Sequence, residues 1–175
     1  MIAPDNKDWT WVLQQPCAEC GFDASTCDAA TVPELIRRNA ITWRGLVADG
    51  TIRPGRPNDH TWSTLEYLCH VRDVYRRFDG RVALMLSEDD PLFPNWDQDA
   101  SAVDDAYETQ AAAKVIDDLT AAAEWFATRL EGLTAGDWDC PGRRSDGANF
   151  TVASIARYMM HDPIHHIWDV TGQRL

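Results

Sequence analysis

The sequence predicts an all-α protein, a four-helix bundle preceded by an irregular N-terminal arm. Apolar residues recur at helical spacing in four segments, and residues with helix-capping chemistry open several of them. No window alternates strictly enough between polar and apolar residues to predict a strand. With 175 residues, of which 45% are hydrophobic, the chain can bury the core of one domain. We expect residues 1–30 to form the arm and residues 31–175 to form the bundle.

The first two helices are predicted from their N-terminal caps. A capping box that starts at Thr31 predicts a helix over residues 32–48, and a second box that starts at Ser63 predicts a long helix over about 64–86. In both segments the apolar residues recur at helical spacing. His70 lies inside the second helix on the border of its apolar arc, a position that suits a ligand at a pocket mouth or a half-exposed histidine.

The second half of the chain predicts two more helices. Residues 104–131 are rich in alanine with a periodic apolar side, and Thr151 caps a last helix that ends at Gly172. Residues 87–103 hold two prolines and many acids, so we expect a long loop that crosses the bundle or covers a site. Residues 132–150 have turn chemistry.

Charge and composition exclude several classes of function. The net charge of −12 and the lack of a basic run argue against nucleic acid and against an anionic membrane surface. No segment approaches the roughly 20 apolar residues that span a bilayer. The N-terminus lacks the basic start and apolar core of a signal peptide. We therefore expect a cytoplasmic protein.

Five cysteines, an odd number, indicate reduced thiols rather than a disulfide framework. Cys17 and Cys20 have the spacing of zinc ligands, but a closed structural site needs four ligands and the sequence assigns no matching second pair. A redox role is not favoured, since no strand-rich pattern surrounds the pair. We expect packed thiols in preference to a structural zinc site.

Three of the five histidines lie within six residues of the last helix. Residues four apart share one helical face, so the run offers two ligand pairs: His161 with His165, or Asp162 with His166. At about 100° per residue, His166 falls on the edge of the apolar arc with Asp162 beside it, and the other pair points nearly the opposite way. Pro163 can kink the helix and reset this phase. Ordinary histidines at a helix end are the alternative.

A four-helix pattern with a histidine inside the second helix and a His-x-x-x-His or acid-x-x-x-His motif in the fourth resembles the DinB/YfiT-like superfamily of metalloenzymes. His70 looks like that family's mid-helix histidine, and the stretch His165–Val170 looks like its double histidine followed by a polar residue. The resemblance covers residues 30–172. It implies a divalent metal ion, zinc or nickel, held by three side chains with open positions for water or substrate.

Carried over by residue, the resemblance implies that His70, Asp162 and His166 are the metal ligands. Many members of the family have a histidine where this chain has Asp162, but the mycothiol-dependent maleylpyruvate isomerase branch has a glutamate there. His161 and His165 would then orient the ligands or line the pocket, and they are the alternative ligands if the helix has the other register.

The resemblance also implies an activity. We expect an enzyme whose metal activates a small mycothiol-like thiol or water for transfer, isomerisation or hydrolysis of a small molecule. The alternative is a bundle that binds a metal or an apolar ligand without turnover, with Trp62, Trp96 and Trp168 around its pocket. A third interpretation is structural, with polar residues of the last helix bonded inside a homodimer.

Overall fold

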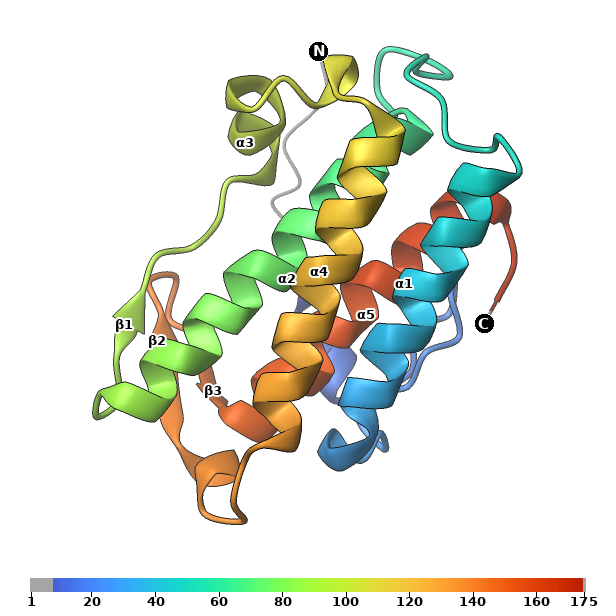
Figure 1. Cartoon of the computed structure of the whole chain (residues 1–175). Coiled ribbons are helices and arrows are strands. Elements are labelled where there is room, and N and C mark those ends of the chain that lie inside the picture. Colours follow the sequence, from blue (N-terminus) through green and yellow to red (C-terminus); the bar gives the residue numbers. More distant parts are fainter. Residues whose placement is uncertain (1–7, 175) are drawn as a thin grey trace.

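The computed structural model describes residues 8–174 and contains four long helices and a small sheet (Figure 1). The long helices are α1 (Val32–Ala48), α2 (Thr64–Ser87), α4 (Ala112–Glu131) and α5 (Val152–Thr171). The shorter elements are α3 (Gln98–Asp104), four 3-10 helices and strands β1 (Leu92–Phe93), β2 (Pro141–Arg144) and β3 (Asn149–Thr151). Outside the described residues lie residues 1–7, which include the N-terminus that lacks signal-peptide features and belong to the predicted arm, and residue 175 of the predicted bundle.

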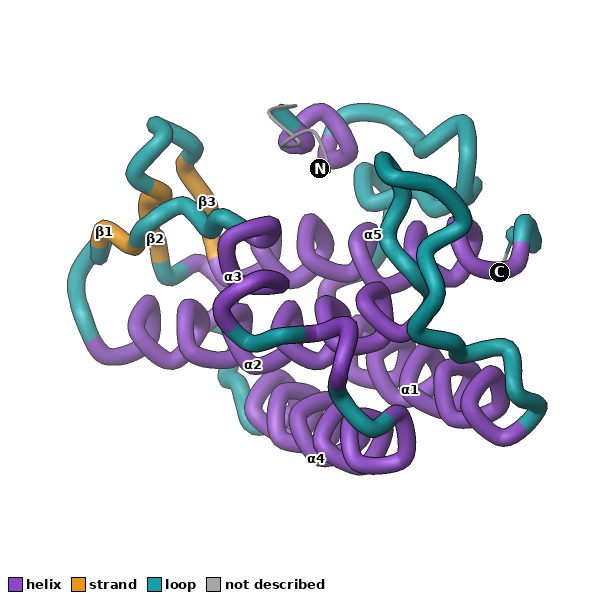
Figure 2. Tube along the Cα trace, turned by 90° about the horizontal axis from the view of Figure 1, so that it is seen from above, coloured by secondary structure: helices purple, strands orange, loops and turns teal. Residues whose placement is uncertain are grey.

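The long helices form a bundle in which neighbours in sequence are not always neighbours in space. α4 packs against both α1 and α2, and α5 packs against the same two helices, whereas α1 and α2 make few contacts with each other. Figure 2 shows α4 and α5 on opposite sides of α2. The segment that joins α2 to α4 carries β1 and α3 along the outside of the bundle (Figure 1). This arrangement leaves α2 and α5 side by side, where a shared site can form.

The helix caps agree with one of the two predicted capping boxes. At the start of α2 the Glu66 carboxylate accepts from Ser63 N at 2.8 Å, and the Ser63 hydroxyl accepts from Glu66 N at 3.2 Å. The box predicted at Thr31 is wrong, because its hydroxyl donates to the carbonyl of Asp28 at 2.8 Å and makes no cap bond. The 3-10 helix Ala29–Thr31 leads directly into α1 and takes the place of that cap.

The three-stranded sheet corrects the prediction of an all-α fold. Its order is β1-β2-β3, with β1 parallel to β2 and β2 antiparallel to β3. Leu92 lies opposite Arg143 and Gly142 lies opposite Phe150. Strands of two to four residues are too short to show an alternating pattern, and the pairing of β1 with β2 joins segments far apart in the sequence. The sheet stacks on the end of α2, since Gly142 has no Cβ to clash with Met85.

The third predicted helix is shorter than expected. It begins at Ala112 rather than at residue 104, because residues 98–104 form the separate helix α3 and Tyr107–Thr109 form a 3-10 turn. The Asp97 carboxylate caps α3 by accepting from Ala100 N at 2.8 Å. The periodic apolar pattern predicts one continuous helix here, because a break of a few residues leaves that pattern nearly in phase.

Helix α5 runs through Pro163 without interruption from Val152 to Thr171. The carbonyl of Pro163 accepts a hydrogen bond from the Asn39 side chain of α1 at 2.9 Å. The same side chain accepts from the Tyr75 hydroxyl of α2 at 2.7 Å. This buried bridge ties three helices together at the middle of α5.

The described part of the N-terminal arm lies along α5. It comprises a 3-10 helix over Trp9–Leu13, a tight turn around residues 17–22 and a second 3-10 helix that enters α1. Both 3-10 helices contact α5, and Figure 2 shows the arm over that helix. No helix among the described residues is long and apolar enough to cross a membrane.

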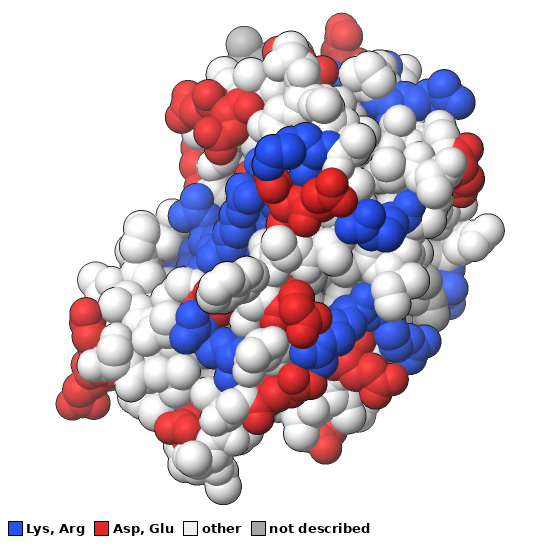
Figure 3. Space-filling model, in the orientation of Figure 1, with Lys and Arg blue, Asp and Glu red and all other residues white. Residues whose placement is uncertain are grey.

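The face in Figure 3 carries mixed charges rather than a continuous basic surface. Charged side chains also pair between helices. Arg37 of α1 bonds Glu124 of α4 at 2.8 Å and also bonds Glu131, while Arg44 bonds Asp117 at 3.2 Å. These pairs are partly exposed, so each contributes little to stability.

Candidate metal centre

Three side chains from α2 and α5 meet between those helices, and we call them the His–Asp cluster: His70, Asp162 and His166. The Nε2 of His70 lies 3.1 Å and 3.4 Å from the two carboxylate oxygens of Asp162. The Nε2 of His166 lies 3.3 Å from the first of these oxygens. One potential ligand atom from each residue lies within 4.8 Å of the others. The structure therefore brings together the three residues that the family resemblance selected.

His70 is buried completely, which corrects the expectation of a border position. Its ring stacks on Trp96 with centroids 4.9 Å apart and planes at 9°, and Trp62 packs on it at 5.2 Å. The nearby Glu66 bonds Arg56 instead of His70. Within the described part of the chain His70 Nδ1 is buried without a hydrogen-bond partner, so aromatic packing and the bond between Nε2 and Asp162 together orient this ring.

His166 is held by a carboxylate on its far side. Its Nδ1 lies 2.7 Å from an oxygen of Asp169, three residues further along α5. A neutral imidazole that donates this bond has its lone pair on Nε2, the atom that faces Asp162. Carboxylates that fix the tautomer of a histidine in this way are typical of metal-binding histidines.

Asp162 is the charged member of the cluster, and its side chain is 33% exposed. Burial works to raise the pKa of Asp162, but the imidazoles of His70 and His166 outweigh burial and hold the pKa of this carboxyl below its usual range. Asp162 is therefore an anion at neutral pH. Two imidazoles and one carboxylate form a donor set that suits zinc with an open coordination position.

The cluster forms part of the wall of a pocket of about 380 Å³ between α5, the arm and the α2–α4 connection. Asp162 and His166 line this pocket, while His70 lies behind them. Trp96 supplies an apolar wall. The other lining residues are mostly polar: Trp9, Phe78, Arg81, Asn95, Asp97, Gln98, Asp99, Arg144, Asp146, Tyr158, Met159, His161 and His165. Of the His–Asp cluster, a small molecule in this pocket would contact the Asp162 carboxylate and the His166 imidazole directly.

His161 and His165 lie on the neighbouring face of α5, about 100° around the helix from the other pair rather than nearly opposite it, and they face the arm. Together with Cys17 and Cys20 they form a second group, the Cys–His cluster, whose four potential ligand atoms lie within 4.8 Å of one another. Both histidines also line the pocket, but they are nearly buried, with 4% and 8% of their surface exposed. Burial lowers the pKa of His161 to about 4 and lowers that of His165 as well.

This second group was visible in the sequence as two separate signals. The first was the Cys-x-x-Cys spacing in the arm, and the second was the His-x-x-x-His spacing around Pro163. Only the folding of the arm onto α5 joins them, because Cys17 and His165 are 148 residues apart in the chain.

Comparison with known proteins agrees with this architecture. The sequence profile of the DinB superfamily matches residues 34–170, which is most of the chain. This chain belongs to the DinB superfamily. The helices that carry the His–Asp cluster lie within the matched region, whereas the arm that carries Cys17 and Cys20 precedes it.

A solved structure shares the DinB fold seen here. The chain is similar to YfiT from Bacillus subtilis, which is described as a probable metal-dependent hydrolase with an unusual four-helix bundle topology. The two match with a TM-score of 0.67 and 17% sequence identity over 86% of each chain. A search of curated protein sequences found no significant match.

Proposed function

We propose that this DinB protein is a metal-dependent enzyme whose active site is the His–Asp cluster. The observation that carries the proposal is the convergence of two imidazoles and one carboxylate within 4.8 Å at the wall of a pocket large enough for a small molecule. The description of YfiT as a metal-dependent hydrolase supports the same class of chemistry. Zinc and nickel are the ions that we propose, since both accept imidazole and carboxylate ligands.

Each residue of the cluster has a separate task in this proposal. A divalent ion held by three ligands lowers the pKa of bound water or thiol at an open position. His70 is held rigidly between tryptophan rings, and His166 is oriented by Asp169. Asp162 would supply the negative charge that offsets part of the charge of the ion. We propose that a small thiol or water is the nucleophile and that the reaction is transfer, isomerisation or hydrolysis.

The pocket favours a substrate with an anionic group. Arg81 lines it and is 7% exposed. Burial lowers the pKa of Arg81 to about 10, so the guanidinium still carries its charge at neutral pH. Its Nη2 donates to the carbonyl of Pro94 at 3.0 Å, and among the described residues it has no hydrogen bond to a carboxylate. A carboxylate on the substrate would supply the missing counter-charge.

Metal titration tests the metal site directly. Chelator-treated protein should bind zinc or nickel in a calorimeter, and His70→Ala should lose one binding event per chain because an inner ligand is gone. His60→Ala is the matched control, since His60 is an exposed histidine outside both clusters. A His70 variant that binds as much metal as the control, with the same affinity, would contradict the assignment of His70 as a metal ligand.

Turnover separates the enzyme from a bundle that only binds. Trp96 lines the pocket and could hold an apolar ligand without chemistry, whereas Trp62 and Trp168 are not among the lining residues. Metal-loaded protein should consume a low-molecular-weight thiol in the presence of an electrophilic carboxylic acid. If the reaction is hydrolysis, it should instead cleave an ester or amide bond in a small substrate that carries a separate carboxylate. The acid should react faster than its methyl ester. Metal binding with no turnover of either kind would favour the binding bundle.

A further inference from the structure

The cysteine pair of the arm lies in a tight turn that is built into the fold. Cys17 N donates to the carbonyl of Phe22 at 2.9 Å, and Gly21 N donates to the carbonyl of Cys17 at 2.9 Å. Gly21 has φ of +80°, a left-handed conformation that favours glycine. Both cysteines are nearly buried, at 3% and 1% exposure. The turn therefore presents two thiols from one short loop to the interior.

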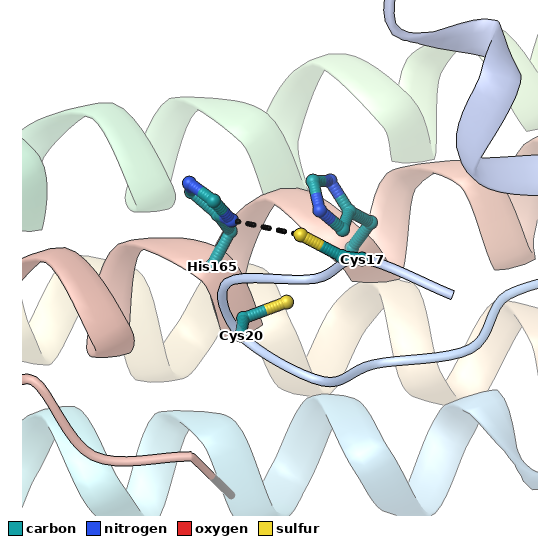
Figure 4. A group of neighbouring side chains, drawn as sticks. Cys17, Cys20 and His165 are labelled. Carbon is teal, nitrogen blue, oxygen red and sulfur yellow. Dashed lines mark hydrogen bonds between the residues drawn. The ribbon is translucent and has the colours of Figure 1, made fainter. Parts of the chain in front are cut away.

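Two histidines on one face of α5 meet this turn. The rings of His161 and His165 lie 5.0 Å apart, as expected for residues four apart on a helix. Cys17 Sγ lies 3.6 Å from His165 Nδ1. A tetrahedral zinc ion with Zn–S of about 2.3 Å and Zn–N of about 2.0–2.1 Å places sulfur and nitrogen about 3.6 Å apart. Figure 4 shows Cys17, Cys20 and His165 directed toward one another.

We propose that Cys17, Cys20, His161 and His165 bind a structural zinc ion that fastens the arm to α5. Two sulfur and two nitrogen donors are the donor set of tetrahedral zinc, and four ligands leave no open position for a substrate. Each thiol would release its proton to solvent as the ion binds. The proposal does not depend on the function proposed for the His–Asp cluster, because the two groups share no ligand.

The surroundings of the ligands support a metal site. His165 Nε2 lies 3.5 Å from Glu19 and 3.8 Å from Asp169, so carboxylates face the ring nitrogen on the side away from Cys17. Negative charge at this distance favours a proton on Nε2, which leaves the lone pair of Nδ1 toward Cys17. Within the described residues His161 Nε2 is buried with no hydrogen-bond partner, and a metal bond is one way to satisfy it.

The C-terminal end of the described chain reinforces the turn. Arg174 Nε donates to the carbonyl of Glu19 at 2.9 Å, and its Nη2 donates to the carbonyl of Ala18. Its side chain also packs 3.3 Å from the position that a Cβ on Gly21 would occupy. The turn is thus held from both sides before any ion binds, which lowers the cost of ordering the ligands.

Reduced thiols packed in the core are the competing explanation. A weak bond between the Cys17 thiol and His165 accounts for their 3.6 Å separation. It does not account for the convergence of four potential ligand atoms or for the unpartnered nitrogen of His161. The two explanations differ in how much metal the folded chain holds.

Zinc content of purified protein tests the proposal. After loading with zinc and desalting, the Cys17→Ser, Cys20→Ser double variant should hold one zinc ion fewer per chain than wild type by plasma mass spectrometry. The matched control is Cys27→Ser with Cys140→Ser, which alters two half-buried cysteines outside the cluster. Equal zinc content in both double variants would overturn the proposal. His70→Ala reports on the other cluster, so the two proposals can fail separately.

Cobalt substitution of wild-type protein tests for thiolate ligands, so this test does not depend on whether a cysteine variant folds. Wild-type protein loaded with Co²⁺ should show thiolate-to-cobalt charge-transfer absorption and the intense visible bands of a tetrahedral ion. His70→Ala should retain the charge-transfer band. An organomercurial reagent should release one zinc ion per chain from wild-type protein, detected with a chromophoric chelator. Wild-type protein that shows no thiolate band and releases no zinc to the mercurial would overturn the proposal.

Discussion

Replacing Asp162 with asparagine tests the His–Asp cluster with the smallest change in shape. The amide keeps the size of the side chain but removes the negative charge that lies 3.1 Å from His70 and 3.3 Å from His166. Structural zinc sites with four ligands bind with about 10–16 kcal/mol, so one ligand contributes about 2.5–4 kcal/mol. Because 1.4 kcal/mol is a factor of ten, Asp162→Asn should weaken metal binding by roughly 10²–10³-fold.

The assay is competition for zinc against a chromophoric chelator near neutral pH. Asp169→Asn is the matched comparison, since Asp169 bonds His166 Nδ1 at 2.7 Å but is not a member of the His–Asp cluster. Loss of such an outer partner should cost about 10–100-fold. The reasoning is refuted if Asp162→Asn binds zinc as tightly as wild type, or if it weakens binding less than Asp169→Asn does.

Two further predictions concern stability. Gly142→Ala should lower the free energy of unfolding by about 1–3 kcal/mol, because its Cβ would lie 2.7 Å from the buried Met85, whereas a Cβ on Gly136 would meet nothing within 4 Å. Equal urea midpoints for Gly142→Ala and the Gly136→Ala control would contradict this. Asp73→Asn should cost roughly 1.5–3 kcal/mol at neutral pH. Burial alone would raise the pKa of Asp73, but hydrogen bonds from Arg72 lower it, so the contribution is present above about pH 4 and is lost as pH falls through the folded-state pKa. Urea titrations in acid should show the difference from wild type shrinking, and a constant difference would count against it.

The long helices could be predicted because their signals are local. The predicted span 32–48 coincides with α1, and the Ser63 capping box marks the start of α2. α5 ends where the sequence indicated, with Gly172 at φ of +68° as its C-cap. Each of these signals depends on residues within one or two helical turns, so the sequence carries it without knowledge of the tertiary fold.

The sheet could not be predicted for the opposite reason. β1 has two residues and pairs with a strand that begins nearly fifty residues later in the chain, so neither strand has a pattern of its own. The turn at Asp146-Gly147 before β3 lies within the span 132–150 that is predicted to have turn chemistry, and Asp-Gly is also typical of hairpins. Tertiary packing against α2 stabilises these strands, and local propensity does not.

The candidate site was predictable in its members but not in its surroundings. Helical spacing and the family resemblance together selected His70, Asp162 and His166, and the structure places them within 4.8 Å. The stacking of His70 on Trp96 depends on a connection that could be described beforehand only as a loop. Whether the cluster binds metal stays a prediction until the titration is done.

Helix α5 carries both clusters because two pairs of residues four apart are offset by a single position. That offset turns the pairs about 100° from each other, so one pair faces α2 and the other faces the arm. Asp169 is placed to act on both, with 2.7 Å to His166 Nδ1 and 3.8 Å to His165 Nε2. We therefore expect Asp169→Asn to weaken metal binding at both clusters, and more at the His–Asp cluster, because Glu19 also faces His165. Asp162→Asn should weaken only one, since Asp162 is not a member of the Cys–His cluster.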